Sequence, residues 1–468
     1  MLFNSGAFLQ FFGAFLLLYW LARQSLAARN LLIVAASYLF YGWWDWRFLG
    51  LLAFSSLFDY GVGLGLERVA APGRRKALLV ASVVCNLTIL GLFKYYDFFV
   101  ESFAHLLADL HVPFQPRTLH IILPVGISFY TFQSMSYALD VYRRKLPATR
   151  NVIHFLAFVS FFPQLVAGPI ERATHLLPQF GQTRRITRDM IEEGLWLMLW
   201  GLFKKVALAD HLAPLADMVF QGSSFSAVTV VLGTLAFGLQ IYCDFSGYSD
   251  IARGTARVLG FDILFNFNLP YTACSPREFW QRWHISLSTW LRDYLYISLG
   301  GNRHGAARTY LNLMVTMLLG GLWHGAAWHF VLWGAWHGSG LMVQRAAGNL
   351  AARVTHSRSG RVAAWLATML FVFYGWMLFR AGSLDQILAM TQALGDFSAP
   401  VWLRSYLINL VGFAAPLVLM QLWQHRRNSL LPALALPGWV RGSLEGLLLV
   451  GILVFWEKDN VPFLYFQF

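Results

Sequence analysis

The run from residue 310 to residue 344 contains no Asp, Glu, Lys or Arg. A helix needs about 20 apolar residues to cross the hydrocarbon core of a bilayer, so this run is too long for one upright crossing. We therefore expect segment 309–344 to form two passes, or one pass and a re-entrant piece. Several small residues would let the backbone bend or approach a neighbouring helix closely: Gly320, Gly321, Gly325, Gly334 and Gly338.

Three histidines lie inside this uncharged segment, at His324, His329 and His337. An imidazole in hydrocarbon is costly unless it has a partner or a cavity, so such residues are functional candidates. A neutral histidine is also a good general base near pH 7. His324 is the strongest candidate because the neighbouring glycines leave room for a ligand, whereas His329 and His337 are expected to be packing or hydrogen-bonding residues.

Composition places the whole chain in the membrane. Of its 468 residues, 57% are hydrophobic and only 13% are charged, whereas soluble domains carry about 25% charged residues. We expect an all-α, polytopic integral membrane protein with 11 to 13 membrane-embedded helices in a single domain over residues 1–468. The N-terminus reads as an uncleaved first span, because it lacks a basic stretch and a cleavage site.

The formal net charge of +13 arises from Lys and Arg in short loops. Loops rich in Lys and Arg alternate along the chain with loops that have few of these residues. This pattern is typical of the positive-inside rule and predicts that the N-terminus lies outside the cytoplasm. No separate basic stripe with interleaved aromatic residues is present, so the pattern argues against nucleic-acid binding. The three cysteines form no C-x-x-C motif and are expected to be small buried hydrophobic residues.

Segment 276–299 has the pattern of an amphipathic interfacial helix. Ser275 and Glu278 have capping-box spacing, and Pro276 would occupy the first helical position. Aromatic and aliphatic side chains recur at steps of three and four along one face. The opposite face would present a polar stripe to water: Arg277, Gln281, His284, Ser288 and Arg292.

Four charged residues lie in or near other apolar segments. Asp244 and Asp250 need partners or water if they lie at membrane depth. Lys204 and Lys205 fall near one end of an expected span, where we interpret them as side chains that snorkel to the interface.

The sequence contains no H-E-x-x-H zinc motif, no phosphate-binding P-loop and no G-x-S-x-G elbow. On a continuous helix His324 and His329 would diverge, and no Cys or acid accompanies them, so we expect no metal site. Arg277, Arg282 and Arg292 are suited to phosphate groups, either of a substrate or of anionic lipids.

Four motifs together resemble the membrane-bound O-acyltransferases, and in particular their bacterial alginate O-acetyltransferase branch. The likeness runs from the N-terminus to the last residue and includes these stretches: 242–250 (YCDFSGYSD), 277–294 (REFWQRWHISLSTWLRDY), 321–328 (GLWHGAAW) and 462–468 (PFLYFQF). Such a joined set is far more specific than a single histidine.

The resemblance implies a helical membrane bundle with a central funnel and interfacial or re-entrant helices. His324 matches the family's catalytic histidine, and His284 matches its second histidine. The acyl donor would be a cytoplasmic thioester, acetyl-CoA, with no permanently bound cofactor. Transfer would lead across the bacterial inner membrane to O-acetylation of an exported exopolysaccharide, alginate or cellulose. A periplasmic partner similar to SGNH hydrolases, the polysaccharide synthesis machinery and membrane lipids would be its partners.

The residues are compatible with more than one chemistry. In one, His324 takes the proton of an acceptor hydroxyl while the hydroxyl oxygen attacks the thioester carbonyl; an acetyl-histidine intermediate is the rival. The indole N–H of Trp323 or Trp328, or a backbone N–H beside Gly325, would stabilise the oxyanion. A second class is a polysaccharide or lipid-linked sugar transporter that cleaves no thioester, and a third is a non-catalytic scaffold.

Overall fold

The computed structural model describes residues 1–348, 355–456 and 462–464, and the last four residues of the C-terminal motif therefore lie outside it. Within these residues the protein is entirely helical, which confirms the all-α class. Six helices in this described part of the chain are long and apolar enough to cross a membrane, so the chain is a multi-pass membrane protein. The count of 11 to 13 embedded helices stays a prediction.

The chain divides into two compact units, one of residues 1–187 with 256–264 and the other of residues 188–255 with 265–468. The expectation of a single domain stays a prediction, and each unit is described by itself. The helices of the first unit are α1 (Gly6–Leu21), α2 (Leu26–Gly42), α3 (Leu49–Arg68), α4 (Pro72–Leu90), α5 (Tyr96–Asp109), α6 (Ile127–Tyr142), α7 (Val152–Ser160), α8 (Phe162–Leu165) and α9 (Ala173–Leu176).

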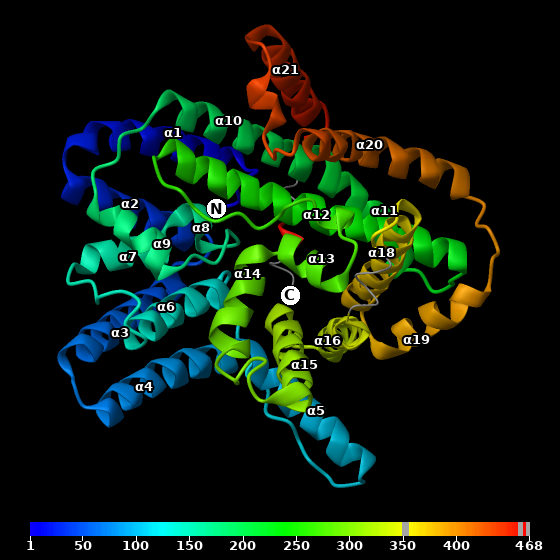
Figure 1. The fold of residues 1–468 in the computed structure, drawn as a ribbon, viewed down its shortest axis with the longest axis horizontal. Helices are drawn as coiled ribbons and strands as arrows, with labels where there is room; N and C mark the ends of the chain where they lie inside the picture. The colour runs from blue at the N-terminus through cyan, green and yellow to red at the C-terminus, as the bar shows by residue number, and fades with distance from the viewer. Residues whose placement is uncertain (349–354, 457–461, 465–468) are drawn as a thin grey trace. The chain divides into compact units, whose positions relative to one another are not determined.

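Within the first unit, α3, α4 and α6 pack side by side (Figure 1). A buried polar cluster joins all three. The carboxylate of Asp59 on α3 accepts hydrogen bonds from Ser82 (2.6 Å) and Asn86 (2.8 Å) on α4 and from Ser134 (2.6 Å) on α6. Because all four side chains are buried, these bonds specify how the helices meet in an apolar environment.

A second polar cluster anchors the loop after α12 within the first unit. The buried carboxylate of Glu171 accepts hydrogen bonds from the Leu264 backbone N–H and from Nδ1 of His175 (2.9 Å). The other ring nitrogen of His175 lies 3.8 Å from Asp262. Asp262 and Glu171 together raise the pKa of His175 from 6.5 to about 10, so this imidazole is cationic at neutral pH.

We predict that this ion cluster gives the unit a pH-dependent stability. Because the folded pKa of His175 is raised, its contribution is fully present below pH 6.5, declines above it and is lost above about 10. The difference in melting temperature between wild type and His175→Gln should therefore shrink as the pH rises from 6 to 10. A difference that stays constant or grows over this range would contradict the assignment.

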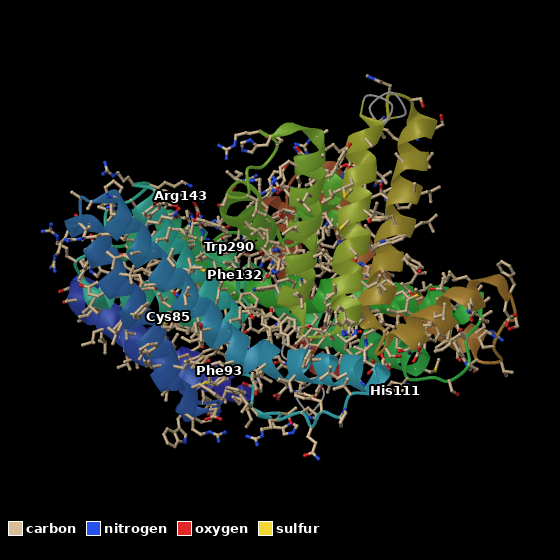
Figure 2. The ribbon with its side chains drawn as sticks, turned by 90° about the horizontal axis from the view of Figure 1, so that it is seen from below. Cys85, Phe93, His111, Phe132, Arg143 and Trp290 are labelled. Atoms are coloured by element: carbon tan, nitrogen blue, oxygen red, sulfur yellow. The ribbon has the colours of Figure 1, made fainter. Side chains whose placement is uncertain are left out.

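The second unit contains the remaining helices that the structure describes. These are α10 (Arg188–Phe203), α11 (Asp210–Phe220), nearly all of α12 (Ala227–Val258), α13 (Pro276–Arg282), α14 (Ile285–Trp290), α15 (Gly305–His324), α16 (Trp328–Ala347), α18 (Arg358–Arg380), α19 (Leu384–Gln392), α20 (Leu403–Arg427) and α21 (Gly438–Val454). Figure 2 shows α15, α16 and α18 standing side by side, and α16 contacts both of the others.

Segment 309–344 forms two helices, as its length and glycines predict. Helix α15 ends at His324, Gly325 is extended (φ −163°, ψ 153°), and α16 starts at Trp328. A side chain at position 325 would overlap the ring of Phe330, and one at 321 would overlap the backbone of Phe330. Glycine is therefore needed at both positions for α15 and α16 to pack closely on either side of the break.

Candidate active site

Two histidines from separate elements meet inside the second unit. His324 is the last residue of α15, and His284 lies between α13 and α14; their ring centroids are 6.5 Å apart. His324 is 4% exposed and His284 0% exposed. The structure thus brings together the two histidines that the sequence singled out.

The helix expected over 276–299 is wrong as a continuous element. The structure forms α13 and α14, followed by a π-helical turn (Leu291–Tyr296). His284 breaks the helix with a left-handed backbone (φ 43°, ψ 54°), a conformation that is costly for a residue with a side chain. The break turns His284 inward, so the prediction that it faces water on a polar stripe is also wrong.

Hydrogen bonds to Asn266 hold the strained backbone around His284. The side-chain oxygen of Asn266 lies 3.4 Å from Nδ1 of His284 and accepts the hydroxyl of Ser286 at 2.6 Å. The backbone oxygen of Asn266 accepts the N–H of Ile285 at 3.0 Å. His284 lies outside the six candidate spans, and burial lowers its pKa from 6.5 to about 3. The imidazole is therefore neutral at pH 7, as a group that accepts a proton or a hydrogen bond must be.

Aromatic rings enclose His324 on several sides. The ring centroids of Trp333, Trp323 and Phe379 lie 5.0, 5.2 and 5.3 Å from that of His324. Trp323 is thus placed at the site as expected, whereas Trp328 is 53% exposed. Water exclusion by these rings strengthens electrostatic interactions at the imidazole.

The other two histidines of the segment have different surroundings. His337 is 1% exposed and packs against Trp333 (4.8 Å between centroids) and Trp280 (5.1 Å). His329 is only partly buried, and its ring is tilted against that of the neighbouring Phe330, with 4.1 Å between centroids. Across residues 1–348, 355–456 and 462–464, no cluster of three or more His, Cys, Asp or Glu is arranged to hold a metal ion.

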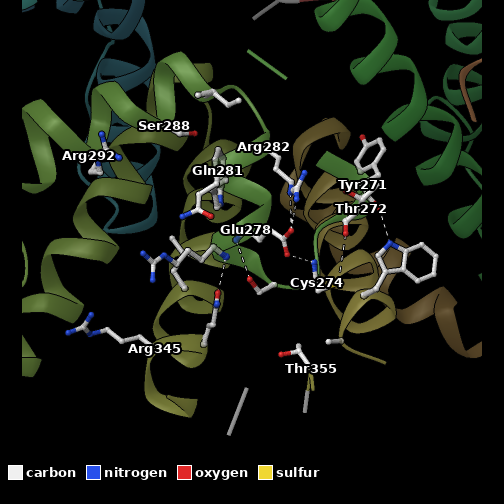
Figure 3. A pocket seen from close by; sticks show the side chains of 18 of the residues that line it. Tyr271, Thr272, Cys274, Glu278, Gln281, Arg282, Ser288, Arg292, Arg345 and Thr355 are labelled. Atoms are coloured by element: carbon white, nitrogen blue, oxygen red, sulfur yellow. Dashed lines mark hydrogen bonds and ion pairs between the residues drawn. The ribbon is translucent and has the colours of Figure 1, made fainter. Parts of the chain in front are cut away.

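A pocket of about 2040 Å³ lies in the same unit and is lined in part by α13 (Figure 3). Its described lining includes the three arginines expected to bind phosphate, Arg277, Arg282 and Arg292. Arg282 forms an ion pair with Glu278 (2.9 Å) and Arg292 one with Asp293 (2.7 Å). Sequence reasoning missed further basic residues of the lining because they come from distant helices and loops: Arg345, Arg361 and His425.

Trp280 connects the pocket to the histidines. Its side chain lines the pocket, and its ring is 5.6 Å from that of Trp333, which in turn contacts His324. Neither His284 nor His324 is part of the pocket lining. An aromatic layer that contains Trp280 and Trp333 therefore connects the arginine-bearing pocket to His324.

A network of buried charges joins residues 204–210 to α12, the helix whose Phe245 contacts His284. Nζ of Lys205 lies 2.7 Å from Asp210 and 2.8 Å from Asp244, and Nζ of Lys204 lies 2.7 Å from Asp250. The expectation that both lysines snorkel to the interface is wrong, since they are 2% and 4% exposed. The acids have the partners that their position in an apolar segment required.

Close packing of α10 against α12 makes these ion pairs possible. A side chain at Gly201 would overlap the backbone of Gly247, and one at Gly247 would overlap that of Gly201. The network also reaches the C-terminal segment, because Asp244 accepts the backbone N–H of Leu464 at 2.8 Å. The adjacent Phe463 packs on Phe245, which contacts the edge of His284.

The sequence of this chain matches known proteins over the regions just described. The model of the membrane-bound O-acyltransferase family matches residues 143–384. A probable alginate O-acetylase of Azotobacter vinelandii is 48% identical over 85% of this chain and 78% of its own length. One from Pseudomonas putida is 42% identical over all of both chains.

A relative that acts on another polymer matches as well. A peptidoglycan O-acetyltransferase of Helicobacter pylori is 38% identical over 78% of this chain and 73% of its own length. The family match covers more than half of the chain, and the relatives extend it to the full length. This chain is therefore a membrane-embedded O-acyltransferase and belongs to the membrane-bound O-acyltransferase family.

Proposed function

We propose that this enzyme transfers acetyl groups from a cytoplasmic thioester donor, acetyl-CoA, for the O-acetylation of an exported polysaccharide. The observation that carries the proposal is the buried pair of His284 and His324 one aromatic layer from an arginine-lined pocket. The activities named for the relatives, alginate O-acetylation and peptidoglycan O-acetylation, support acetyl as the acyl group and a polysaccharide as the final acceptor.

In this proposal His324 is the general base. It accepts the proton of the acceptor hydroxyl as that oxygen attacks the thioester carbonyl. Collapse of the tetrahedral intermediate expels the thiolate, which takes the proton from the imidazolium and leaves as a thiol. His284, held by Asn266, orients the donor or assists His324. Direct transfer needs no covalent enzyme intermediate, and an acetyl-histidine is the alternative route.

The pocket is the proposed entrance for the donor. Five arginines and one carboxylate, Glu278, are among the described residues of its lining. Guanidinium groups match phosphate oxygens in charge and geometry, and coenzyme A carries several phosphates at the end opposite its thioester. Arg277, Arg282 and Arg292 would hold those phosphates while the thioester reaches past Trp280 toward His324.

The cellular setting follows from the same chemistry. We place the enzyme in the bacterial inner membrane, where a cytoplasmic donor meets an acceptor on the periplasmic side. Short external loops, as expected from the sequence, offer little surface for a long polymer. A periplasmic acetyltransferase similar to SGNH hydrolases and the exopolysaccharide synthesis machinery would complete the transfer, on alginate or on cellulose.

Cysteine labelling tests whether the pocket binds the donor. Cys274 lies in the pocket lining, whereas Cys243 is buried and Cys85 lies on another helix. In a Cys85→Ser background, coenzyme A should slow maleimide labelling of Cys274 at least tenfold at saturation. Arg277→Ala combined with Arg345→Ala should weaken this protection, whereas Arg188→Ala, a surface control, should leave it intact.

Thioester cleavage distinguishes this proposal from transport of a sugar. Purified enzyme supplied with acetyl-CoA and a hydroxyl acceptor should release free coenzyme A and form an acetyl ester in equal amounts. Vesicles that move a lipid-linked sugar without releasing coenzyme A would support the transporter instead. Unprotected Cys274 together with absent thioester cleavage would refute the proposal.

A further inference from the structure

Buried polar nitrogen atoms gather in the aromatic layer between the pocket and His324. The indole nitrogens of Trp280 and Trp333 and both ring nitrogens of His337 are buried, and none has a hydrogen-bond partner among the described residues. A buried N–H without an acceptor costs about 1–3 kcal/mol. Such groups are rare in folded proteins, and each calls for an explanation.

The three side chains form one cluster. The ring centroids of Trp280 and Trp333 are 5.6 Å apart, and that of His337 lies 5.1 Å from the first and 4.8 Å from the second. The cluster connects the pocket to His324, because Trp280 lines the pocket while Trp333 contacts His324 edge to face at 5.0 Å between centroids. On the proposed route of the acyl group from the pocket to His324, the group would pass this cluster.

Two other indole groups of the same unit have backbone acceptors. Nε1 of Trp336 on α16 donates to the backbone oxygen of Phe371 at 2.9 Å, and Nε1 of Trp365 donates to that of Tyr271 at 2.8 Å. The indoles of Trp280 and Trp333 lack such an acceptor and lie on the proposed path of the substrate. A carbonyl oxygen is the acceptor that an acyl donor would bring to them.

We propose that the indole N–H groups of Trp333 and Trp280 bind the carbonyl oxygen of the acyl group and stabilise the oxyanion that forms during transfer. When the oxygen of the acceptor hydroxyl attacks the carbonyl carbon, the carbonyl π electrons move to the carbonyl oxygen. At the same time the hydroxyl proton moves to His324. When the carbonyl re-forms, the carbon–sulfur bond breaks and the thiolate takes the proton from His324. Both indole N–H groups only donate hydrogen bonds to the carbonyl oxygen, and they neither give up nor accept a proton.

This assignment rests on the proposed function and changes the choice of oxyanion donors expected from the sequence. Trp328 was a candidate there, but its side chain is 53% exposed. Trp333 was not, because it lies nine residues beyond His324 and on the next helix. The break at Gly325 folds α16 back along α15 and so brings Trp333 against the imidazole.

The test replaces only the N–H group. Benzothienylalanine has the shape of tryptophan with sulfur in place of N–H, and it can be inserted at position 333 or, as a matched control, at 336. At 333 we expect kcat to fall about 10²–10³-fold, the effect of losing one oxyanion donor. Coenzyme A protection of Cys274 and the melting temperature should be unchanged. Trp333→Phe and Trp280→Phe should also lower kcat.

At position 336 the same replacement should show the opposite pattern. It removes the hydrogen bond to Phe371, so the melting temperature should fall while kcat stays within about twofold of wild type. If the analogue at 333 keeps the wild-type kcat while the wild type transfers acetyl, the indole assignment fails and the proposed function survives. If the wild type itself cleaves no thioester, both fail.

Discussion

Replacing His324 by alanine should reduce acetyl transfer by about 10²–10⁴-fold, the usual contribution of a positioned general base. The imidazole is 4% exposed, lies at the break between α15 and α16, and faces His284 at 6.5 Å between centroids. Without it, the acceptor hydroxyl loses its assigned base, and His284, whose pKa burial lowers to about 3, is too weak a base to replace it. The acetyl content of the exported polymer in a strain that carries only the variant measures the loss.

His329→Ala is the matched control for this variant. His329 belongs to the same uncharged segment, but it lies at the start of α16 and is partly exposed. Its replacement should leave polymer acetylation within about twofold of wild type and expression of the protein unchanged, since surface substitutions usually change stability by less than about 0.5 kcal/mol. Equal losses in both variants would show that the segment, and not the imidazole of His324, sets the activity.

Lys205→Met should destabilise the second unit by about 3–5 kcal/mol, the cost of breaking a buried ion pair by removing one partner. Lys205 is the shared cation of Asp210 and Asp244, and all three residues are buried. Its loss leaves two carboxylates facing each other without a counter-charge. We expect a lower melting temperature in detergent and faster proteolysis of the C-terminal segment that Asp244 holds.

A surface ion pair supplies the comparison. Arg188 pairs with Glu192 one helical turn away, and the Arg188 side chain is 88% exposed, so Arg188→Met should cost less than about 1 kcal/mol. Lys205→Met combined with Asp210→Asn and Asp244→Asn should recover part of the lost stability, because neutral amides tolerate the absence of the cation. If Lys205→Met and Arg188→Met melt at the same temperature, the buried network does not stabilise the fold.

Prediction from the sequence succeeded where one segment contains all the residues on which the prediction depends. The uncharged run predicted two helices, and its glycines mark the place where α15 ends and α16 begins. His324 could be recognised because burying an imidazole in an uncharged, apolar segment costs free energy, and such residues are therefore usually functional. The resemblance to the family added His284, whose position beside His324 no local pattern could give.

The failures share a physical cause, which is that side-chain periodicity assumes a regular helix. At 276–299 the pattern predicted a polar stripe, but the left-handed backbone of His284 turned that residue inward. The lysines at 204 and 205 were misplaced because each pairs with an aspartate of another helix, about 40 residues further along the chain. The sequence did contain evidence for these ion pairs, since acidic and basic residues in separate apolar segments are stable there only when they pair.

The most direct measurement is the release of free coenzyme A by the purified enzyme in nanodiscs, followed with a thiol-reactive dye in the presence of a hydroxyl acceptor. We predict acceptor-dependent release by the wild type and by His329→Ala, and a rate at least about 10²-fold lower for His324→Ala. A folded His324→Ala protein that releases coenzyme A at the wild-type rate would contradict the assignment of the catalytic base.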